Sequence, residues 1–266
     1  MITLWNEVPG LDLSLSPDVP ALTPYRVPGS APRGAVIVCP GGGYGCRVER
    51  EGEPMARWLN SLGLHAFVLT YRVRPYRYPW PVLDGKRAVR VLRHQAEGLG
   101  VRPDQIGIMG FSAGGHLAST VATHFDEADA AAVDAVDAVS CRPDFAILCY
   151  PVITLDGEAA HRGSAANLLG PEAPPELLAR FSNERHVTAR TPPCFLWHSM
   201  RDTAVPVANS LRFAAALADC GVPFGLHIYP GGQHGWGHGW NGSDACTWKE
   251  SCAEWLRLMQ FTPVPA

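Results

Sequence analysis

A serine in a glycine-rich turn is the clearest chemical signal in the sequence. Residues 110–114 read GFSAG and fit the pattern G-x-S-x-G, in which the serine sits on a sharp turn between a strand and a helix. The apolar run 105–109 indicates a buried strand before it, and residues 116–122 indicate a helix after it. Gly110 and Gly114 would let neighbouring backbone pass close to a strained turn. We therefore predict a nucleophile at Ser112, the alternative being an ordinary glycine-rich turn with an incidental serine.

An acid and a base follow later strand-like segments. Asp202 comes after the apolar run 194–198, and His234 comes after the run 224–229. The chain order Ser, Asp, His is the order of an α/β-hydrolase triad. A serine hydroxyl needs a base to take its proton, and imidazole has a suitable pKa near neutral pH. A carboxylate would hold the imidazole in the right tautomer, so we predict a catalytic triad of Ser112, Asp202 and His234.

A run of three glycines supplies the fourth part of such a site. Residues 41–43 follow the apolar strand 35–39, and glycines expose backbone N–H groups with no side chain in the way. We predict that the N–H groups of Gly42, Gly43 and Ala113 bind the oxyanion of a tetrahedral intermediate. Tyr44 and Trp236 flank this chemistry and are predicted to shape the substrate pocket, the alternative being plain packing.

Other residues compete for these roles. Asp202 alone could be a turn residue, and Asp156 and Glu184 are rival acids, but neither rival follows a strand so closely. A loop of arginines and tyrosines at 71–78 is predicted either to rim the pocket or to be solvated. The remaining histidines of the strands and of the helix after the serine are predicted to be core or edge residues: His65, His116, His198 and His227.

His238 competes with His234 and, four residues away, raises the possibility of a metal pair. Gly235 and Gly237 between them argue against the helix that would aim both rings one way, and no strong third ligand appears. We therefore predict neither a metal nor another cofactor.

The elements that must position these groups alternate along the chain. Several strands are continuously apolar, which is typical of a parallel sheet covered by helices on both faces. In such sheets functional groups gather at the carboxyl ends of the strands. The expected strands are 35–39, 64–71, 105–109, 145–150, 194–198 and 224–229, and the expected long helices are 51–62, 82–99, 206–219 and 245–261, besides the helix after Ser112.

The chain is expected to divide into a proline-rich N-terminal arm, residues 1–33, and one catalytic domain, residues 34–266. The arm is predicted to hold one short edge strand near 22–27. An insertion over the sheet edge is expected at about 151–193, with one short helix near 176–181. Residues 126–139 fit neither helical nor strand period and are predicted to be a surface loop or frayed helix.

Bulk composition excludes several classes of function. A chain of 266 residues suits one large α/β domain, and a net charge of −3 gives no bulk attraction to nucleic acid or an anionic membrane. No apolar run approaches the ~18 residues that span a bilayer, and the first residues lack the pattern of a signal peptide. The eight cysteines form no C-x-x-C pair, so we predict a cytoplasmic protein with free thiols, a pairing of Cys246 with Cys252 being left open.

Four segments together resemble a known group of enzymes. They are CPGGGYG at 39–45, GIMGFSAGGHLA at 107–118, DTAVP at 202–206 and HIYPGGQHG at 227–235. The chain resembles the α/β-hydrolase esterases related to acetyl esterases and acetylxylan esterases, a group near the hormone-sensitive-lipase-like enzymes. Pro40 stands where many relatives have the histidine of H-G-G-G. The resemblance implies an α/β-hydrolase fold and an open site for small acyl groups.

We therefore expect a serine carboxylesterase for short acyl esters, above all acetyl esters of a carbohydrate or similar alcohol. Its partner would be a small-molecule or oligosaccharide ester, with no nucleic acid and no membrane, and no oligomeric state is predicted. One alternative is an amidase such as an arylformamidase, or a peptidase, on the same fold. A second is a non-catalytic binding protein on that scaffold, against which the complete set of site residues argues.

Overall fold

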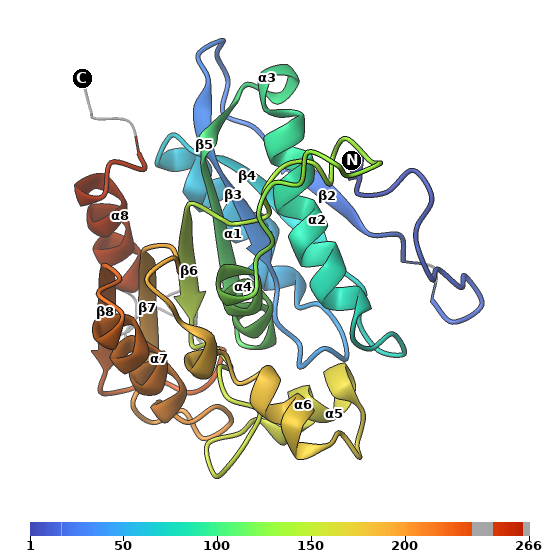
Figure 1. Ribbon diagram of the computed structural model, residues 1–266. Coiled ribbons are helices and arrows are strands. Elements are labelled where there is room, and N and C mark those ends of the chain that lie inside the picture. The colour runs from blue at the N-terminus through green and yellow to red at the C-terminus, as the bar shows by residue number, and fades with distance from the viewer. Residues whose placement is uncertain (17, 236–246, 263–266) are drawn as a thin grey trace.

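The computed structural model describes residues 1–16, 18–235 and 247–262. Within these ranges the strands form a single sheet of order β1-β2-β4-β3-β5-β6-β7-β8 (Figure 1). The strands are β1 (Ile2–Thr3), β2 (Ala21–Tyr25), β3 (Arg33–Cys39), β4 (His65–Thr70), β5 (Val101–Phe111), β6 (Phe145–Cys149), β7 (Cys194–Ser199) and β8 (Phe224–Tyr229). The strands from β4 to β8 in this order pair in parallel, and β1 and β2 add an antiparallel edge. The mostly parallel sheet predicted from the sequence is confirmed.

Strand β3 shows why its sequence is apolar without a break. Ile37 and Cys39 face one hydrophobic core, while Val36 and Val38 face a second core on the other side of the sheet. All four side chains have no exposed surface. Successive side chains of a strand point to opposite faces, so a strand covered on both faces must be apolar at every position.

Helices cover both faces of the sheet (Figure 1). Buried residues of α2, α4 and α7 belong to one core, and buried residues of α1 and α8 belong to the other. The α-helices are α1 (Glu53–Ser61), α2 (Trp80–His94), α3 (Ala96–Leu99), α4 (Ala113–Thr123), α5 (Arg162–Leu169), α6 (Pro175–Arg180), α7 (Ala208–Asp219) and α8 (Trp248–Leu258), and the 3₁₀ helices are η1 (Glu49–Glu51) and η2 (Asn183–His186). Among the described residues, no helix combines the length and apolar composition needed to cross a bilayer.

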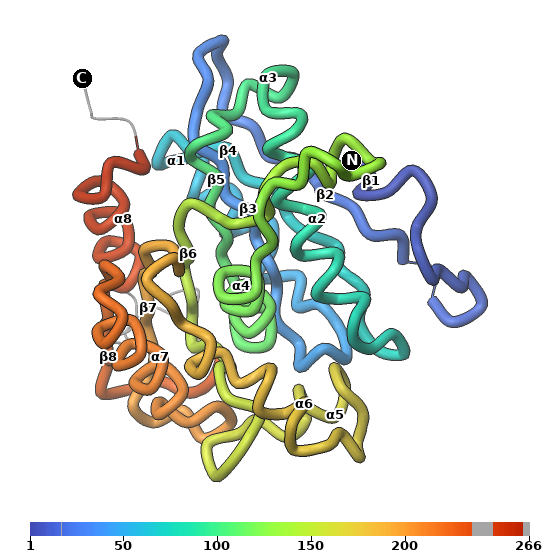
Figure 2. The backbone as a smooth tube through the Cα atoms, viewed as in Figure 1, coloured from blue at the N-terminus to red at the C-terminus, as the bar shows by residue number. Residues whose placement is uncertain are grey.

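The N-terminal segment begins in the edge strand β1 and passes beside α2 before it returns to the sheet as β2 (Figure 2). The Trp5 indole donates a hydrogen bond to Asp84, and the Arg87 guanidinium donates to the carbonyl of Leu4. Arg72, from the loop predicted to be solvated or to rim the pocket, is instead fully buried and paired with Asp84 at 2.7 Å. A guanidinium and a carboxylate that satisfy each other's hydrogen bonds can be buried together. Nothing in the sequence around Arg72 or Asp84 indicates that the two residues form such a pair.

The segment between β6 and β7 carries α5, α6 and η2, and Figure 1 shows α5 and α6 beyond the arrowhead of β6. The short helix predicted near residues 176–181 corresponds to α6, whereas α5 was missed because its sequence has little amphipathic spacing. Residues 126–139 form turns without a helix or strand. The seven cysteines within the described ranges are free thiols, and Cys246 lies outside those ranges.

Close backbone approaches lock β3, β5 and α4 together around the serine turn. A Cβ atom on Gly114 would lie 2.1 Å from the carbonyl oxygen of Cys39, and one on Gly110 would lie 2.0 Å from the carbonyl oxygen of Gly114. Real Cβ contacts are never this short, so both positions require glycine. The steric role predicted for these two glycines is confirmed.

Replacing Gly114 by alanine should destabilise the protein by at least about 3 kcal/mol, because the new methyl group must push apart two backbone segments. Gly98→Ala is the matched control, since an added Cβ there meets nothing within 4 Å and Gly98 lies in α3. The control should stabilise by up to about 1 kcal/mol, the difference in helix propensity. Urea unfolding of both variants measures the contrast, and equal stability of the two would contradict the packing described.

Candidate active site

Ser112 lies at the junction of β5 and α4, in a backbone conformation that residues other than glycine rarely adopt. Its φ is 53° and its ψ is −119°. Its N–H donates to the carbonyl of Cys149 at 3.0 Å, and its carbonyl accepts from the N–H of Val152 at 3.0 Å. The end of β6 thus holds both backbone polar groups of the serine, which offsets the cost of the strained turn.

His234 bridges Ser112 and Asp202. Its Nε2 lies 2.7 Å from the Ser112 Oγ, and its Nδ1 lies 2.6 Å from a carboxylate oxygen of Asp202. An ionised carboxylate only accepts hydrogen bonds, so Nδ1 carries the proton and Nε2 accepts from the serine hydroxyl. The structure therefore brings together the three side chains predicted from sequence, in the protonation pattern that a general base needs.

Asp202 is held by a second set of donors. Its other oxygen accepts from the N–H groups of Ala204 and Val205, at 3.0 and 2.8 Å. The Nε2 of His198 lies 3.3 Å from the oxygen that binds His234. Burial by itself would raise the pKa of Asp202, but hydrogen bonds from His198 and His234 together hold it well below its ordinary value. The carboxylate is therefore ionised at neutral pH.

The rival residues lie apart from this chain of hydrogen bonds. Asp156 pairs with Arg185 on the segment between β6 and β7, at 2.7 Å. No hydrogen bond within the described ranges joins Glu184 to Ser112 or His234. His238 and Trp236 lie outside the described residues.

The carbonyl groups of the glycine loop are all engaged by the protein. The carbonyl of Gly41 accepts from Val48, that of Gly42 accepts from Gly45, and that of Gly43 accepts from the side-chain amide of Asn167. In contrast, none of the hydrogen bonds in the described part of the chain is donated by the N–H of Gly42 or Gly43. The N–H of Ala113, the first residue of α4, likewise has no partner within its helix. These three donors are thus left available to a ligand.

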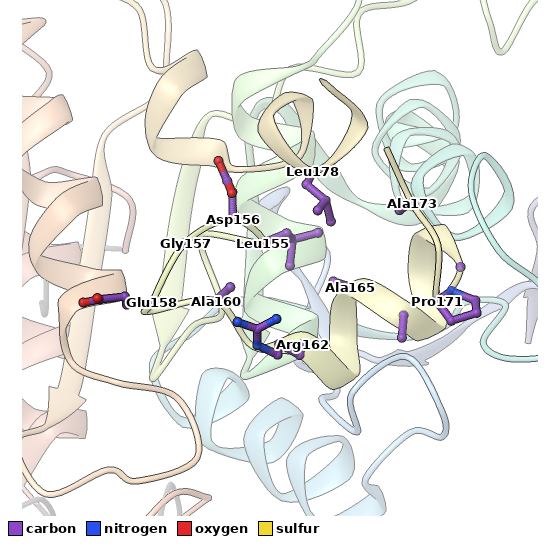
Figure 3. A pocket seen from close by; sticks show the side chains of 12 residues that line it. Leu155, Asp156, Gly157, Glu158, Ala160, Arg162, Ala165, Pro171, Ala173 and Leu178 are labelled. Carbon is purple, nitrogen blue, oxygen red and sulfur yellow. The ribbon is translucent and has the colours of Figure 1, made fainter. Parts of the chain in front are cut away.

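The serine opens into a small pocket of about 200 Å³. It is lined by Gly42, Gly43, Val48, Arg50, Glu51, Ser112, His161, His234 and Gly235. A larger hollow of about 580 Å³ lies between the loop after β6 and the helices α5 and α6 (Figure 3). Ala160 and Arg162 line this larger hollow, while His161 between them lines the small pocket. The two hollows therefore share one wall.

Tyr44 does not line the pocket, which contradicts its predicted contact with substrate. Its side chain has no exposed surface, and its hydroxyl lies 2.8 Å from the Nδ1 of His116. The backbone of Tyr44 has a φ of 58°, so the chain reverses after the glycines and turns the ring into the core. His116 in turn lies 2.8 Å from the carbonyl of Phe181 through its Nε2, which confirms it as a packed histidine of the helix.

Three functional candidates were missed from the sequence. Glu51 lies buried beside the glycine loop, and His198 supports Asp202 from within a strand. His161 accepts from the N–H of Ser164 through Nδ1, so the neutral ring carries its proton on Nε2. Burial, and then positive charge on His234, lowers the pKa of His161. Only His198 had a sequence signal, because it precedes Asp202 by four residues.

Residues 27–217 match the family described as BD-FAE. The chain belongs to the BD-FAE family. It is 39% identical over 221 residues to endo-1,4-beta-xylanase B of Butyrivibrio fibrisolvens, covering 82% of this chain and 34% of that protein. It is 35% identical over 232 residues to the acetylxylan esterase of Xylanibacter ruminicola, covering 85% of this chain and 46% of that protein. The chain thus spans between a third and a half of these curated relatives.

A solved structure resembles the chain over nearly its whole length. It is the acetyl ester-xyloside bifunctional hydrolase from Caldicellulosiruptor lactoaceticus, with 48% sequence identity and a TM-score of 0.96. The match covers 99% of this chain and 97% of that chain. The chain therefore has the α/β-hydrolase fold of the esterases, as the sequence motifs implied.

The buried His116 predicts that stability falls in mild acid. Burial lowers its pKa to about 4, against about 6.5 in the unfolded chain, so only the unfolded chain binds this proton between those values. The free energy of unfolding is therefore at its full value above about pH 6.5. It falls by roughly 3 kcal/mol as the pH approaches 4, because the unfolded chain binds this proton and the folded chain does not. Urea unfolding from pH 7 to 4.5 should show a shallower pH slope for His116→Gln than for the wild type. The exposed His94→Gln serves as control, and a slope unchanged in His116→Gln would contradict the prediction.

Proposed function

We propose that the protein is a serine carboxylesterase that removes short acyl groups, above all acetyl groups, from carbohydrate esters. The observation that carries the proposal is the hydrogen-bonded series Ser112–His234–Asp202 beside the donors of the glycine loop. Relatives named as an acetylxylan esterase and as an acetyl ester-xyloside hydrolase support the ester bond and the carbohydrate alcohol.

Acylation begins when His234 takes the hydroxyl proton of Ser112 and the Oγ attacks the ester carbonyl. The carbonyl oxygen becomes an oxyanion, which accepts hydrogen bonds from the N–H groups of Gly42, Gly43 and Ala113. Asp202 stabilises the imidazolium that forms. The intermediate collapses as His234 gives its proton to the leaving alcohol, and an acyl group remains on the Oγ.

Deacylation repeats these steps with water as the nucleophile. His234 removes a proton from the water, the oxyanion forms again at the same donors, and the serine leaves with the proton. The two half-reactions together consume one water and release the alcohol and the acid. The pocket beside Ser112, about 200 Å³, is small for a long acyl chain, which favours acetate as the acid.

Ser112→Ala should lower kcat on p-nitrophenyl acetate by roughly 10⁴–10⁶-fold, because the covalent intermediate can no longer form. Initial rates at saturating substrate measure the effect, with circular dichroism to show that the variant is folded. Ser61→Ala is the control, since Ser61 is exposed at the end of α1 and remote in sequence from the site. A folded Ser112→Ala enzyme that keeps most of its turnover would refute the proposed nucleophile.

A substrate panel tests the class of bond and the acyl length. We expect kcat/KM to fall by about tenfold or more from acetyl to octanoyl esters, because longer chains outgrow the pocket. Acetylated xylo-oligosaccharide should be deacetylated, with release of acetate measured directly. N-formyl amides and peptides complete the panel, and a strong preference for any amide would overturn the assignment to esters.

A further inference from the structure

Glu51 is a buried carboxylic acid to which the proposed reaction assigns no step. It ends η1, lines the pocket that holds Ser112, and is 2% exposed. No salt bridge within the described ranges includes it. A carboxylic acid withdrawn from water needs hydrogen-bond partners, so the identity of its partners indicates what it does.

One partner is the glycine loop itself. The Gly41 N–H donates to the Glu51 Oε2 at 2.7 Å, and the Gly41 carbonyl accepts from Val48 at 3.0 Å. Each peptide unit is planar, with its C=O and N–H pointing in opposite directions. The bond from Val48 therefore also sets the direction of the Gly42 N–H, and the bond to Glu51 sets the orientation of the preceding unit. Glu51 thus fixes the start of the segment that presents the oxyanion donors.

Gly41 also lies against the nucleophile. A Cβ atom on Gly41 would be 2.9 Å from the Glu51 Oε2 and 3.1 Å from the Cβ of Ser112. Both groups therefore lie against the same side of the Gly41 Cα, as does the carbonyl oxygen of Phe111. A shift of the loop towards the position of Glu51 would change the distance between the donors and the Oγ of Ser112.

The second partner is Tyr150, the residue that follows β6. Its hydroxyl donates to the Glu51 Oε1 at 2.7 Å. Its ring packs edge-on against the ring of His234, with the centroids 5.0 Å apart and the planes at 75°. The preceding carbonyl, of Cys149, accepts the N–H of Ser112. One carboxylic acid therefore joins the glycine loop to the ring on which the catalytic imidazole rests.

We propose that Glu51 is a positioning residue, which holds the Gly41 peptide and the Tyr150 ring so that the oxyanion donors and His234 keep their places about Ser112. It touches no reacting atom and acts through these two neighbours. The inference rests on the esterase function proposed above.

At position 51 the side chain must be long enough to bond both Gly41 and Tyr150 and must carry a hydrogen-bond acceptor, but it need not carry a negative charge. A glutamine at 51 has the same length, so its carbonyl can accept from Gly41 while its amide donates to the Tyr150 oxygen. An aspartate keeps the charge but is one methylene shorter and cannot reach both donors. The two conservative variants therefore separate hydrogen bonding from charge.

The experiment compares Glu51→Gln, Glu51→Asp and Tyr150→Phe with the wild type on p-nitrophenyl acetate. Glu51→Asp should lose about 10²-fold in kcat, the effect of misplacing oxyanion donors, with KM within about threefold. Glu51→Gln should stay within about fivefold of the wild type. Tyr150→Phe keeps the bond to Gly41 and should lose less than Glu51→Asp. Val89→Ala, a truncation of a buried side chain of α2, is the control for lost stability and should keep its kcat.

A transition-state analogue gives a second measurement. A methyl trifluoromethyl ketone forms a reversible adduct with the serine whose oxyanion occupies the same donors. Its inhibition constant should rise in Glu51→Asp by the factor by which kcat/KM falls, and should change little in Glu51→Gln. A role limited to stability would move the melting temperature but neither kcat nor this constant.

Three results would overturn the inference in an active wild-type enzyme. They are a folded Glu51→Asp with kcat within threefold of the wild type, a change confined to KM, and a Glu51→Gln that loses as much kcat as Glu51→Asp. Should Glu51→Asp not fold, Tyr150→Phe takes its place: a folded Tyr150→Phe with lower kcat and weaker analogue binding supports the inference, and one unchanged in both refutes it. Absence of esterase activity in the wild type, or an active Ser112→Ala, would instead refute the proposed function.

Discussion

The backbone at Ser112 is the constraint around which the rest of the structure is arranged. A residue other than glycine is strained at a φ of 53°, and this conformation persists only where the surrounding structure holds it. The carbonyl of Cys149 and the N–H of Val152 hold it from β6, and the close approach of Gly114 to Cys39 holds it from β3. Three neighbouring strands must therefore end in register before the hydroxyl can point into the pocket.

Asp202 bonds to His234 directly, and Glu51 bonds to Tyr150, whose ring packs against His234; the protein shifts the pKa values of these two acids in opposite directions. Burial raises the pKa of both, but the hydrogen bonds from His198 and His234 reverse this for Asp202. The pKa of Glu51 is raised, because the effect of burial is larger than the opposing effect of the hydrogen bonds from Tyr150 and Gly41. Asp202, bonded to imidazoles, is suited to stabilise a cation, whereas Glu51, bonded to uncharged donors, is suited to hold them in place.

The sequence predicts the parts of the site that follow strands and misses those that depend on packing. Ser112, Asp202 and His234 could be placed because apolar runs mark the strands and parallel strands bring their carboxyl ends together. Glu51 could not, since an acid at the start of the helix expected at 51–62 is ordinary. Tyr44 was misjudged because its positive φ, which turns the ring towards His116, has no signature in a tyrosine. Helix α5 was missed because its apolar residues do not repeat at helical spacing.

The position of β8 at the open edge of the sheet has a consequence for how the molecule loses activity. Among the described strands it pairs with β7 alone, and its residues are partly or fully exposed, whereas those of β7 are all buried. Free energies of local opening are lowest at such margins. His234 follows the edge strand β8, while Ser112 follows the central β5, so the base is attached to a more exposed strand than the nucleophile is. Under gentle heating we expect inactivation to precede global melting, and cooling to restore activity without refolding of the core.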